Sequence, residues 1–402
     1  MAVRTLRHPS AVARERAAGF RPLLIVWGSW LVLMAGANLA TPLYAVYASR
    51  FGFSSLVLTS IFATYAIVLV PSLILCGRLS DRFGRRPVIF AGLAVSCVGL
   101  LLFAFAESAG WLYGARAVQG LAVGMISGAA TAALVELDPG SDRRRAAMFA
   151  GLAQAGGSAA GPLLAGVLAQ WAPDRLRLCF FVGLALTVVA GAATLTLSED
   201  LGEREPWRIQ VPRVPRDRLG DFLRVSLSAA TVWATVALFL SIVPSYAADL
   251  LKTSNLALLA TLAALALLAS FATQIVSQRR RRDPRASQAV GLVLLSAGLV
   301  ALVLASPLGS LTLLVVGALA AGTGHGLTFL NAQEELNELA PPERRGEVTA
   351  AFIACIYFLV ATAVIGTGLL DELLSLSASV AVVSVVLVAL ALLGAALNAR
   401  HR

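Results

Sequence analysis

The sequence predicts an all-α membrane protein in which twelve transmembrane helices form two pseudo-symmetric six-helix bundles. Three observations predict this fold. The 402-residue chain is 58% hydrophobic and 13% charged with a mean hydropathy of +0.82, and a water-soluble globule cannot cover its surface with so few polar groups. Twelve apolar runs are long enough to cross a bilayer. The second half of the chain also echoes the first.

Each apolar run is continuous and lacks the alternation of membrane strands, so we expect helices. The first run is too long for a signal-peptide core and has no evident cleavage site, so we interpret it as a retained span. The runs cover residues 23–47, 55–76, 87–106, 111–135, 146–170, 178–197, 222–248, 256–276, 289–306, 310–333, 348–370 and 374–397.

The basic residues predict the orientation of these spans. Most of the 32 lysines and arginines lie in the tails and in alternate loops. By the positive-inside rule both termini are cytoplasmic, and we expect a multi-pass protein of the plasma membrane. The net charge of +10 is dispersed along the chain, which favours topology and lipid contacts over nucleic-acid binding. Arg116 is the one arginine expected inside a span.

A polar stretch at residues 198–220 divides the chain near its midpoint. We interpret it as a cytoplasmic linker between an N-terminal half, 1–197, and a C-terminal half, 221–402. The loop sequence Asp-Arg-Arg-Arg at 142–145 recurs as Glu-Arg-Arg at 343–345, an offset of 201 residues. A repeat of half the chain length is typical of duplicated transporter folds.

The gap between the second and third runs reads CGRLSDRFGRRP and is unusually rich in arginine and glycine. It resembles the loop motif of the major facilitator superfamily, G-x-L-a-D-r-x-G-r-k, and it lies where that family has it. At the same offset, residues 278–285 keep the charge but have lost the glycines. Residues that match the motif include Gly77, Asp81, Arg82, Gly84, Arg85 and Arg86.

Two further stretches resemble motifs of the twelve-span drug:proton antiporter branch. In the fourth run, Leu112 to Arg116 with Gln119 and Gly120 is similar to l-x-x-x-R-x-x-Q-G. The fifth run is similar to g-x-x-x-G-P-x-x-G-G, although Ala165 replaces the first glycine of the closing pair. Its matching residues are Gly157, Gly161, Pro162 and Gly166. The alternative is that these glycines serve only close helix packing.

The resemblance implies that the loop motif latches the two halves together on the cytoplasmic side. Asp81 would then hold the start of the eleventh span or Arg345, with Gly77 and Gly84 permitting close backbone approach. A helix N-terminus stabilises a nearby acid by roughly 0.3 to 1 kcal/mol. The alternative for Arg78, Arg85 and Arg86 is that they only fix the topology.

Polar side chains within spans predict a proton or substrate pathway, because lipid-facing helices avoid them. The resemblance implies a proton-relay role for Arg116. His325 is the one histidine inside a span, and it is either a proton carrier or a hydrogen-bonded packing residue. Acids lie at helix ends, with Glu136 and Glu334 nearest to membrane depth. The third, sixth, ninth and twelfth spans have no strongly polar residue and are expected at the periphery. The pathway candidates are Asn38, Arg116, Gln119, Gln154, His325 and Asn331.

Taken together, the resemblance implies a secondary transporter and no enzyme. It would export a small organic compound or drug in exchange for protons by alternating access. We expect it to act as a monomer, with no cofactor, no metal and no nucleic acid partner. Two alternatives are a uniporter or symporter of a neutral solute such as a sugar, and a non-transporting membrane receptor or scaffold.

Overall fold

The computed structural model describes residues 19–140, 143–198, 211–278, 283–341 and 344–399. Every regular element in these ranges is a helix, as predicted. The helices are α2 (Arg21–Asn38), η1 (Thr41–Leu43), α3 (Tyr44–Phe51), α4 (Ser55–Cys76), α5 (Leu79–Phe83), α6 (Arg85–Ala104), α7 (Ala109–Leu137), α8 (Arg143–Trp171), α9 (Leu178–Thr194), η2 (Arg216–Arg218), α10 (Leu219–Ser241), α11 (Val243–Leu251), α12 (Leu256–Gln278), α13 (Pro284–Ala305), α14 (Leu311–Leu339), α15 (Arg345–Leu373) and α16 (Leu376–Ala399).

The predicted spans are found as helices, with two differences in shape. Within the described residues eleven segments are long and apolar enough to cross a membrane, and the sixth span, α9, is a shorter apolar helix. The first and seventh spans were expected to be continuous, but each is interrupted. The first breaks between α2 and α3 near Pro42, and the seventh breaks at Ile242, before Pro244. Proline lacks the N–H that a continuous helix requires.

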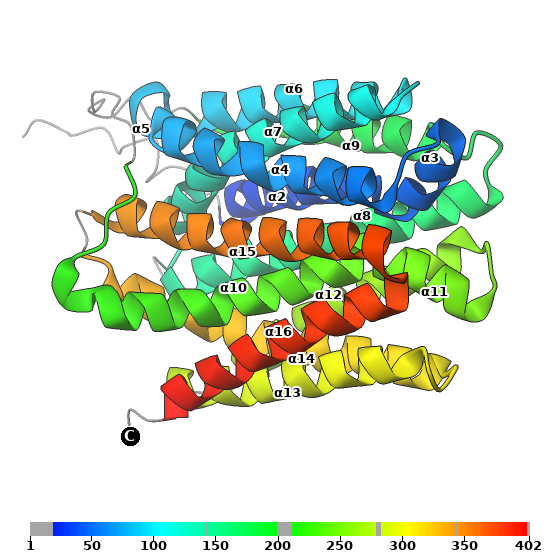
Figure 1. The fold of residues 1–402 in the computed structure, drawn as a ribbon. Coiled ribbons are helices and arrows are strands. Elements are labelled where there is room, and N and C mark those ends of the chain that lie inside the picture. Colours follow the sequence, from blue (N-terminus) through cyan, green and yellow to red (C-terminus); the bar gives the residue numbers. More distant parts are fainter. Residues whose placement is uncertain (1–18, 141–142, 199–210, 279–282, 342–343, 400–402) are drawn as a thin grey trace, which may run out of the picture.

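The helices form two bundles, which lie in the upper and lower parts of Figure 1. The first contains α2, α4, α6, α7, α8 and α9, and the second contains α10, α12, α13, α14, α15 and α16. Equivalent helix pairs pack in both bundles. The pairs α6–α7, α4–α7 and α2–α8 of the first bundle correspond to α13–α14, α12–α14 and α10–α15 of the second. The predicted pseudo-symmetry is therefore confirmed.

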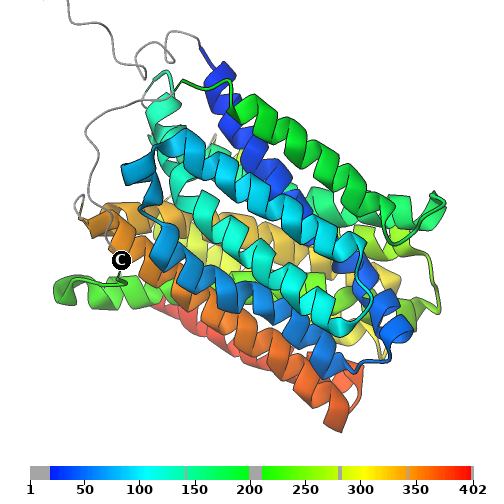
Figure 2. The same ribbon diagram turned by 90° about the horizontal axis from the view of Figure 1, so that it is seen from above.

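Two helix pairs, α4 with α15 and α8 with α12, carry much of the contact between the bundles, and Figure 2 shows α4 beside α15 from above. A Cβ at Gly368 of α15 would overlap Thr59 of α4, and a Cβ at Gly166 of α8 would overlap Ala260 of α12. Glycine therefore allows the backbones to approach closely across both seams.

One end of the molecule carries α5, the first turn of α10 and the last turn of α16, and we call it the basic end. It lies at the left of Figure 1, and α3 and α11 lie at the opposite end. The third, sixth, ninth and twelfth spans (α6, α9, α13 and α16) pack chiefly within their own bundles, which agrees with their expected peripheral place.

Candidate functional site

The loop after α4 forms a charged cluster at the basic end. Gly84 separates α5 from α6 with φ +94°, a backbone conformation that favours glycine. This turn lets the Arg85 guanidinium donate to Asp81 Oδ1 at 2.6 Å and to Ser80 Oγ at 2.5 Å. The same guanidinium donates to Glu136 Oε1, at the end of α7, at 2.9 Å. The loop motif is thus tied to the fourth span.

The other motif residues lie around this cluster. The backbone of Gly77 presses on α7, where a Cβ at Gly128 would be 2.7 Å from its oxygen. Arg82 is exposed beside the Phe83 ring, and Arg86 is partly exposed. The side chain of Arg345 lies outside the described residues, as does Glu343. The contact of Asp81 with the start of α15 therefore stays a prediction, and the partner that the structure gives to Asp81 is Arg85.

The broken first span explains the contacts of Arg116. Because α2 ends at Asn38, its last carbonyls lack the donors of a continuing helix, and that of Gly36 accepts from Leu39 N at 3.4 Å. Arg116 Nη1 donates to the carbonyl of Ala37 at 2.7 Å, and Gln119 Nε2 donates to that of Gly36 at 3.0 Å. Both side chains are buried. They therefore stabilise the break from one face of α7.

Arg116 also reaches the second span. Its Nη2 donates to the carbonyl of Phe62 at 3.4 Å, and its Cζ lies 4.6 Å from the Tyr65 ring centroid. A partly desolvated cation over such a ring gains about 1 to 2 kcal/mol. Asn38, another pathway candidate, makes its hydrogen bonds elsewhere. Asn38 instead donates to Met34 of its own helix and, at 3.3 Å, to Ser158 of α8.

His325 centres a second polar group, in the other bundle. Its Nδ1 lies 2.8 Å from Ser270 Oγ, which also accepts from Gln274 Nε2 at 3.1 Å. The imidazole is fully buried, and Trp233 and Phe329 pack on it with ring centroids 4.8 and 5.5 Å away. His325 is thus hydrogen-bonded through Nδ1, whereas its Nε2 is buried without a hydrogen-bond partner. The role of His325 as a proton carrier stays a prediction.

The predicted pathway residues therefore divide into two sets. Arg116, Gln119 and Asn38 gather beside the break in the first span. His325 and Asn331 belong to α14, where Asn331 donates to Leu327 of the same helix. Gln154 is half-buried on α8. The structure does not bring the two sets into hydrogen-bond contact.

The glycine motif of the fifth span is a packing surface. A Cβ at Gly157 would overlap the carbonyl oxygen of Leu31, and one at Gly161 would overlap that of Ala35, both on α2. Gly166, about two and a half turns from Gly157, lies on the opposite face of α8 and faces α12 of the other bundle. Pro162 lies inside α8. The motif thus lets α8 sit between the first and eighth spans, which is the close-packing role weighed from the sequence.

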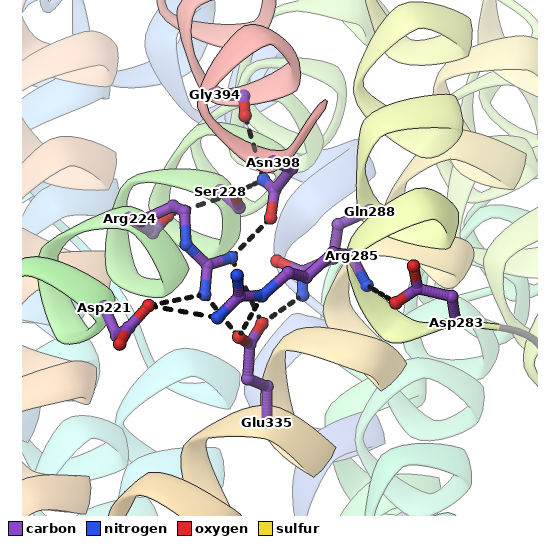
Figure 3. Close-up of polar contacts among 9 residues, drawn as sticks. All are labelled: Asp221, Arg224, Ser228, Asp283, Arg285, Gln288, Glu335, Gly394 and Asn398. Carbon is purple, nitrogen blue, oxygen red and sulfur yellow. Dashed lines mark hydrogen bonds and ion pairs between the residues drawn. The ribbon is translucent and has the colours of Figure 1, made fainter. Parts of the chain in front are cut away.

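A larger charged cluster in the second bundle was missed by sequence reasoning (Figure 3). Arg224 of α10 donates to Glu335 of α14 through both terminal nitrogens, and Arg285 of α13 donates to Glu335 Oε1 at 3.2 Å. Gln288 donates to Glu335 Oε2 at 2.8 Å, and Asn398 of α16 accepts from Arg224. One carboxylate therefore joins the basic ends of α10, α13 and α14, and Arg224 extends the cluster to α16. Asp221 of α10 also accepts from both arginines.

This cluster corrects three sequence-based statements. Arg116 is not the one buried arginine within a span, because Arg224 is 5% exposed. The ninth and twelfth spans do contain buried amides, Gln288 and Asn398, which lie just outside the predicted limits. The buried acid of α14 is Glu335 and not its neighbour Glu334, which is half-buried.

The Arg–Glu pair is repeated in both bundles. Arg85 at the start of α6 pairs with Glu136 on α7, and Arg285 at the start of α13 pairs with Glu335 on α14. The offsets are 200 and 199 residues. The sequence signal for the second pair is that an arginine and a glutamate both recur at almost the repeat length. Within the described residues, no three His, Cys, Asp or Glu side chains gather to hold a metal ion.

The family model of the Major Facilitator Superfamily matches residues 26–364. The chain belongs to the Major Facilitator Superfamily. The resemblance inferred from the loop motif is therefore confirmed, and the family and fold are those of membrane transporters.

Individual superfamily members match shorter segments. The chain is 31% identical over 209 residues to a triacylglyceride transporter of Mycobacteroides abscessus, covering 50% of this chain and 38% of that protein. It is 30% identical over 142 residues to the class B tetracycline resistance protein of Escherichia coli, covering 35% and 33%. The matches thus span under half the length of each curated relative.

The solved structure of the human organic anion transporter MFSD10 (TETRAN) shares the fold. Its TM-score is 0.70 at 18% identity, and the match covers 94% of this chain and 99% of that one. At this identity the likeness concerns the fold alone.

Proposed function

We propose that this superfamily member exports a small organic compound across the plasma membrane in exchange for protons. Its two bundles would rock about the seams α4–α15 and α8–α12, so that a central site opens to one side at a time. The basic end would face the cytoplasm, together with both termini, because lysine and arginine concentrate there. The linker at 198–220 would join the halves on that side.

The observation that supports this proposal most directly is the glycine contact across both seams. Gly368 and Gly166 bring helix backbones of opposite bundles close together. A surface of this kind can slide or separate at small cost, because few rotamers have to change. The antiporter-type glycines Gly157 and Gly161 pack α8 against the first span, and α8 also forms the seam with α12.

The charged cluster around Arg85 would act as the latch of the basic end. Arg85 binds Asp81 and Glu136 together, which holds the loop rigidly against α7. Asp81 Oδ1 accepts a hydrogen bond from Arg85, and we propose that the carboxylate also contacts the first turn of α15. Release of that contact would allow the cytoplasmic side to open. Export as the direction is supported by the relatives named tetracycline resistance proteins.

Passage of a neutral solute is the second candidate, and one observation favours it. The buried carboxylate that the structure shows inside a span, Glu335, is already neutralised by Arg224 and Arg285. Both oxygens of this carboxylate accept hydrogen bonds from α10 and α13, which assigns Glu335 to the packing of the second bundle. Proton coupling would then depend on another group, for which His325 is our candidate.

The test is a drug susceptibility panel in an efflux-deficient host, followed by transport in everted membrane vesicles. A compound to which the chain confers resistance should dissipate an imposed pH gradient when it is added to the vesicles. Vesicles that contain the Asp81→Asn variant at equal expression serve as the control, and the compound should dissipate their pH gradient far less. Resistance or uptake that is unaffected by a protonophore would instead support the neutral-solute alternative.

A further inference from the structure

Arg116 is a buried cation for which the structure supplies no carboxylate partner among the described residues. It is 3% exposed, and its hydrogen-bond acceptors are the carbonyls of Ala37 and Phe62 and the amide oxygen of Gln119. Carbonyl and amide dipoles stabilise the guanidinium but leave its full positive charge in place. A charged side chain at membrane depth costs at least about 2.5 kcal/mol, and such residues usually mark a ligand or ion pathway.

Several hydrogen-bond donors at this place lack an acceptor. Arg116 Nε and the hydroxyl of Tyr44 are both buried without a hydrogen-bond partner, as is the hydroxyl of Tyr65. Tyr44 begins α3, directly after the break in the first span, and its ring packs edge to face on the Phe62 ring, which the Arg116 guanidinium also contacts. A buried donor that lacks an acceptor is costly, so an orphan pair beside a cation calls for an explanation.

Aromatic rings surround this donor pair. The guanidinium lies 5.0 Å from the Phe62 ring centroid, and the Phe62 ring lies 6.5 Å from the Tyr44 ring. Tyr65, which also faces Arg116, meets Tyr357 of α15 edge to face across the seam at 6.0 Å. Aromatic rings therefore lie next to the guanidinium, and one of them stands at the boundary between the bundles.

We propose that Arg116 and Tyr44 form an anion subsite of the transport site, and that the substrate is a small organic acid with an aromatic body. Its carboxylate accepts from Arg116 Nε and from the Tyr44 hydroxyl, and it supplies the counter-charge that the protein lacks there. Charge-assisted hydrogen bonds of this kind are the strong ones. Because both donors are buried, the ligand reaches them when α4 and α15 separate. This inference names a substrate class for the proposed transport function and rests on it.

The test uses the purified full-length chain in detergent and measures ligand-dependent shifts of the melting temperature. The probes are benzoate, salicylate and 2-naphthoate, each compared with its neutral methyl ester and with a cationic amine on the same ring. We expect at least one acid to raise the melting temperature while its ester and amine do not. The comparison on the wild-type chain needs no variant, so it holds even where a substitution impairs folding.

Variants then locate the site. Arg116→Gln and Tyr44→Phe should each raise the dissociation constant of the acid, by about tenfold or more for Arg116→Gln. Arg50→Gln removes an exposed arginine from the end of α3 and should leave binding unchanged. The inference is overturned if no acid stabilises the chain, if esters or amines stabilise it equally, or if the effect survives Arg116→Gln.

The vesicle assay separates this inference from the proposed function. Export of neutral or cationic compounds that is coupled to the pH gradient, with no binding of acids, would refute the anion subsite and leave proton-coupled export standing. Binding of an acid that depends on Arg116, with no transport against a gradient, would uphold the subsite and refute the export.

Discussion

Loss of the Glu335 charge should destabilise the second bundle strongly, whereas the equivalent change in the first bundle should not. Glu335 is buried and accepts hydrogen bonds from Arg224, Arg285 and Gln288. In Glu335→Gln one acceptor oxygen remains, but Arg224, whose side chain is 4% exposed, loses its main counter-charge. Removing one partner of a buried ion pair costs 3–5 kcal/mol, so we expect about 3 kcal/mol.

The matched change is Glu136→Gln in the first bundle. Its partner Arg85 has a side chain that is 28% exposed, and Glu136 is 40% exposed. Solvent already screens this pair, so we expect a loss of about 1 kcal/mol or less. For a bundle of this size, about 2 to 4 °C of melting temperature corresponds to 1 kcal/mol. Glu335→Gln should therefore melt about 6 to 12 °C below the wild type.

The assay is thermal unfolding of the purified variants in detergent, followed by intrinsic fluorescence. The double variant Arg224→Gln with Glu335→Gln should recover part of the loss, because it removes the buried cation, for which Asp221 is the one remaining carboxylate partner among the described residues, together with its partner Glu335. A melting temperature of Glu335→Gln equal to that of Glu136→Gln would refute the reasoning, since burial would then not distinguish the two pairs.

Three further predictions concern transport. Asp81→Asn should sharply reduce transport at unchanged expression, because the amide loses the charge that Arg85 and the start of α15 require; normal transport would exclude the latch. His325→Gln should retain substrate binding but lose dependence on the pH gradient, and an accumulation that still collapses with a protonophore would exclude His325 as the proton carrier. Gly368→Ala should slow transport by spreading α15 from α4, whereas Gly366→Ala, whose Cβ meets no atom within 4 Å, should not; equal rates for the two would contradict a seam that depends on glycine.

The sequence by itself determined the fold class and much of the topology. Continuous apolar runs fix the helices, because every backbone polar group within a bilayer must be paired inside its own segment. Pro42 and Pro244 also mark the interruptions of the first and seventh spans, although both runs were predicted to be unbroken. The glycines of the fifth span indicated a close contact, but the sequence could not name the helix that they face.

The partners of the polar residues were decided only by the tertiary structure. Neighbouring residues on a helix point about 100° apart, and a span that is apolar all round gives no periodicity to show which one faces inward. The choice between Glu334 and Glu335 therefore depended on where α10 and α13 place Arg224 and Arg285. Arg116 was evident in the sequence as a charge within a span. That it binds the carbonyl of Ala37 at the break in the first span was decided by the packing of α7 against α2, because such long-range pairings leave no trace in local sequence.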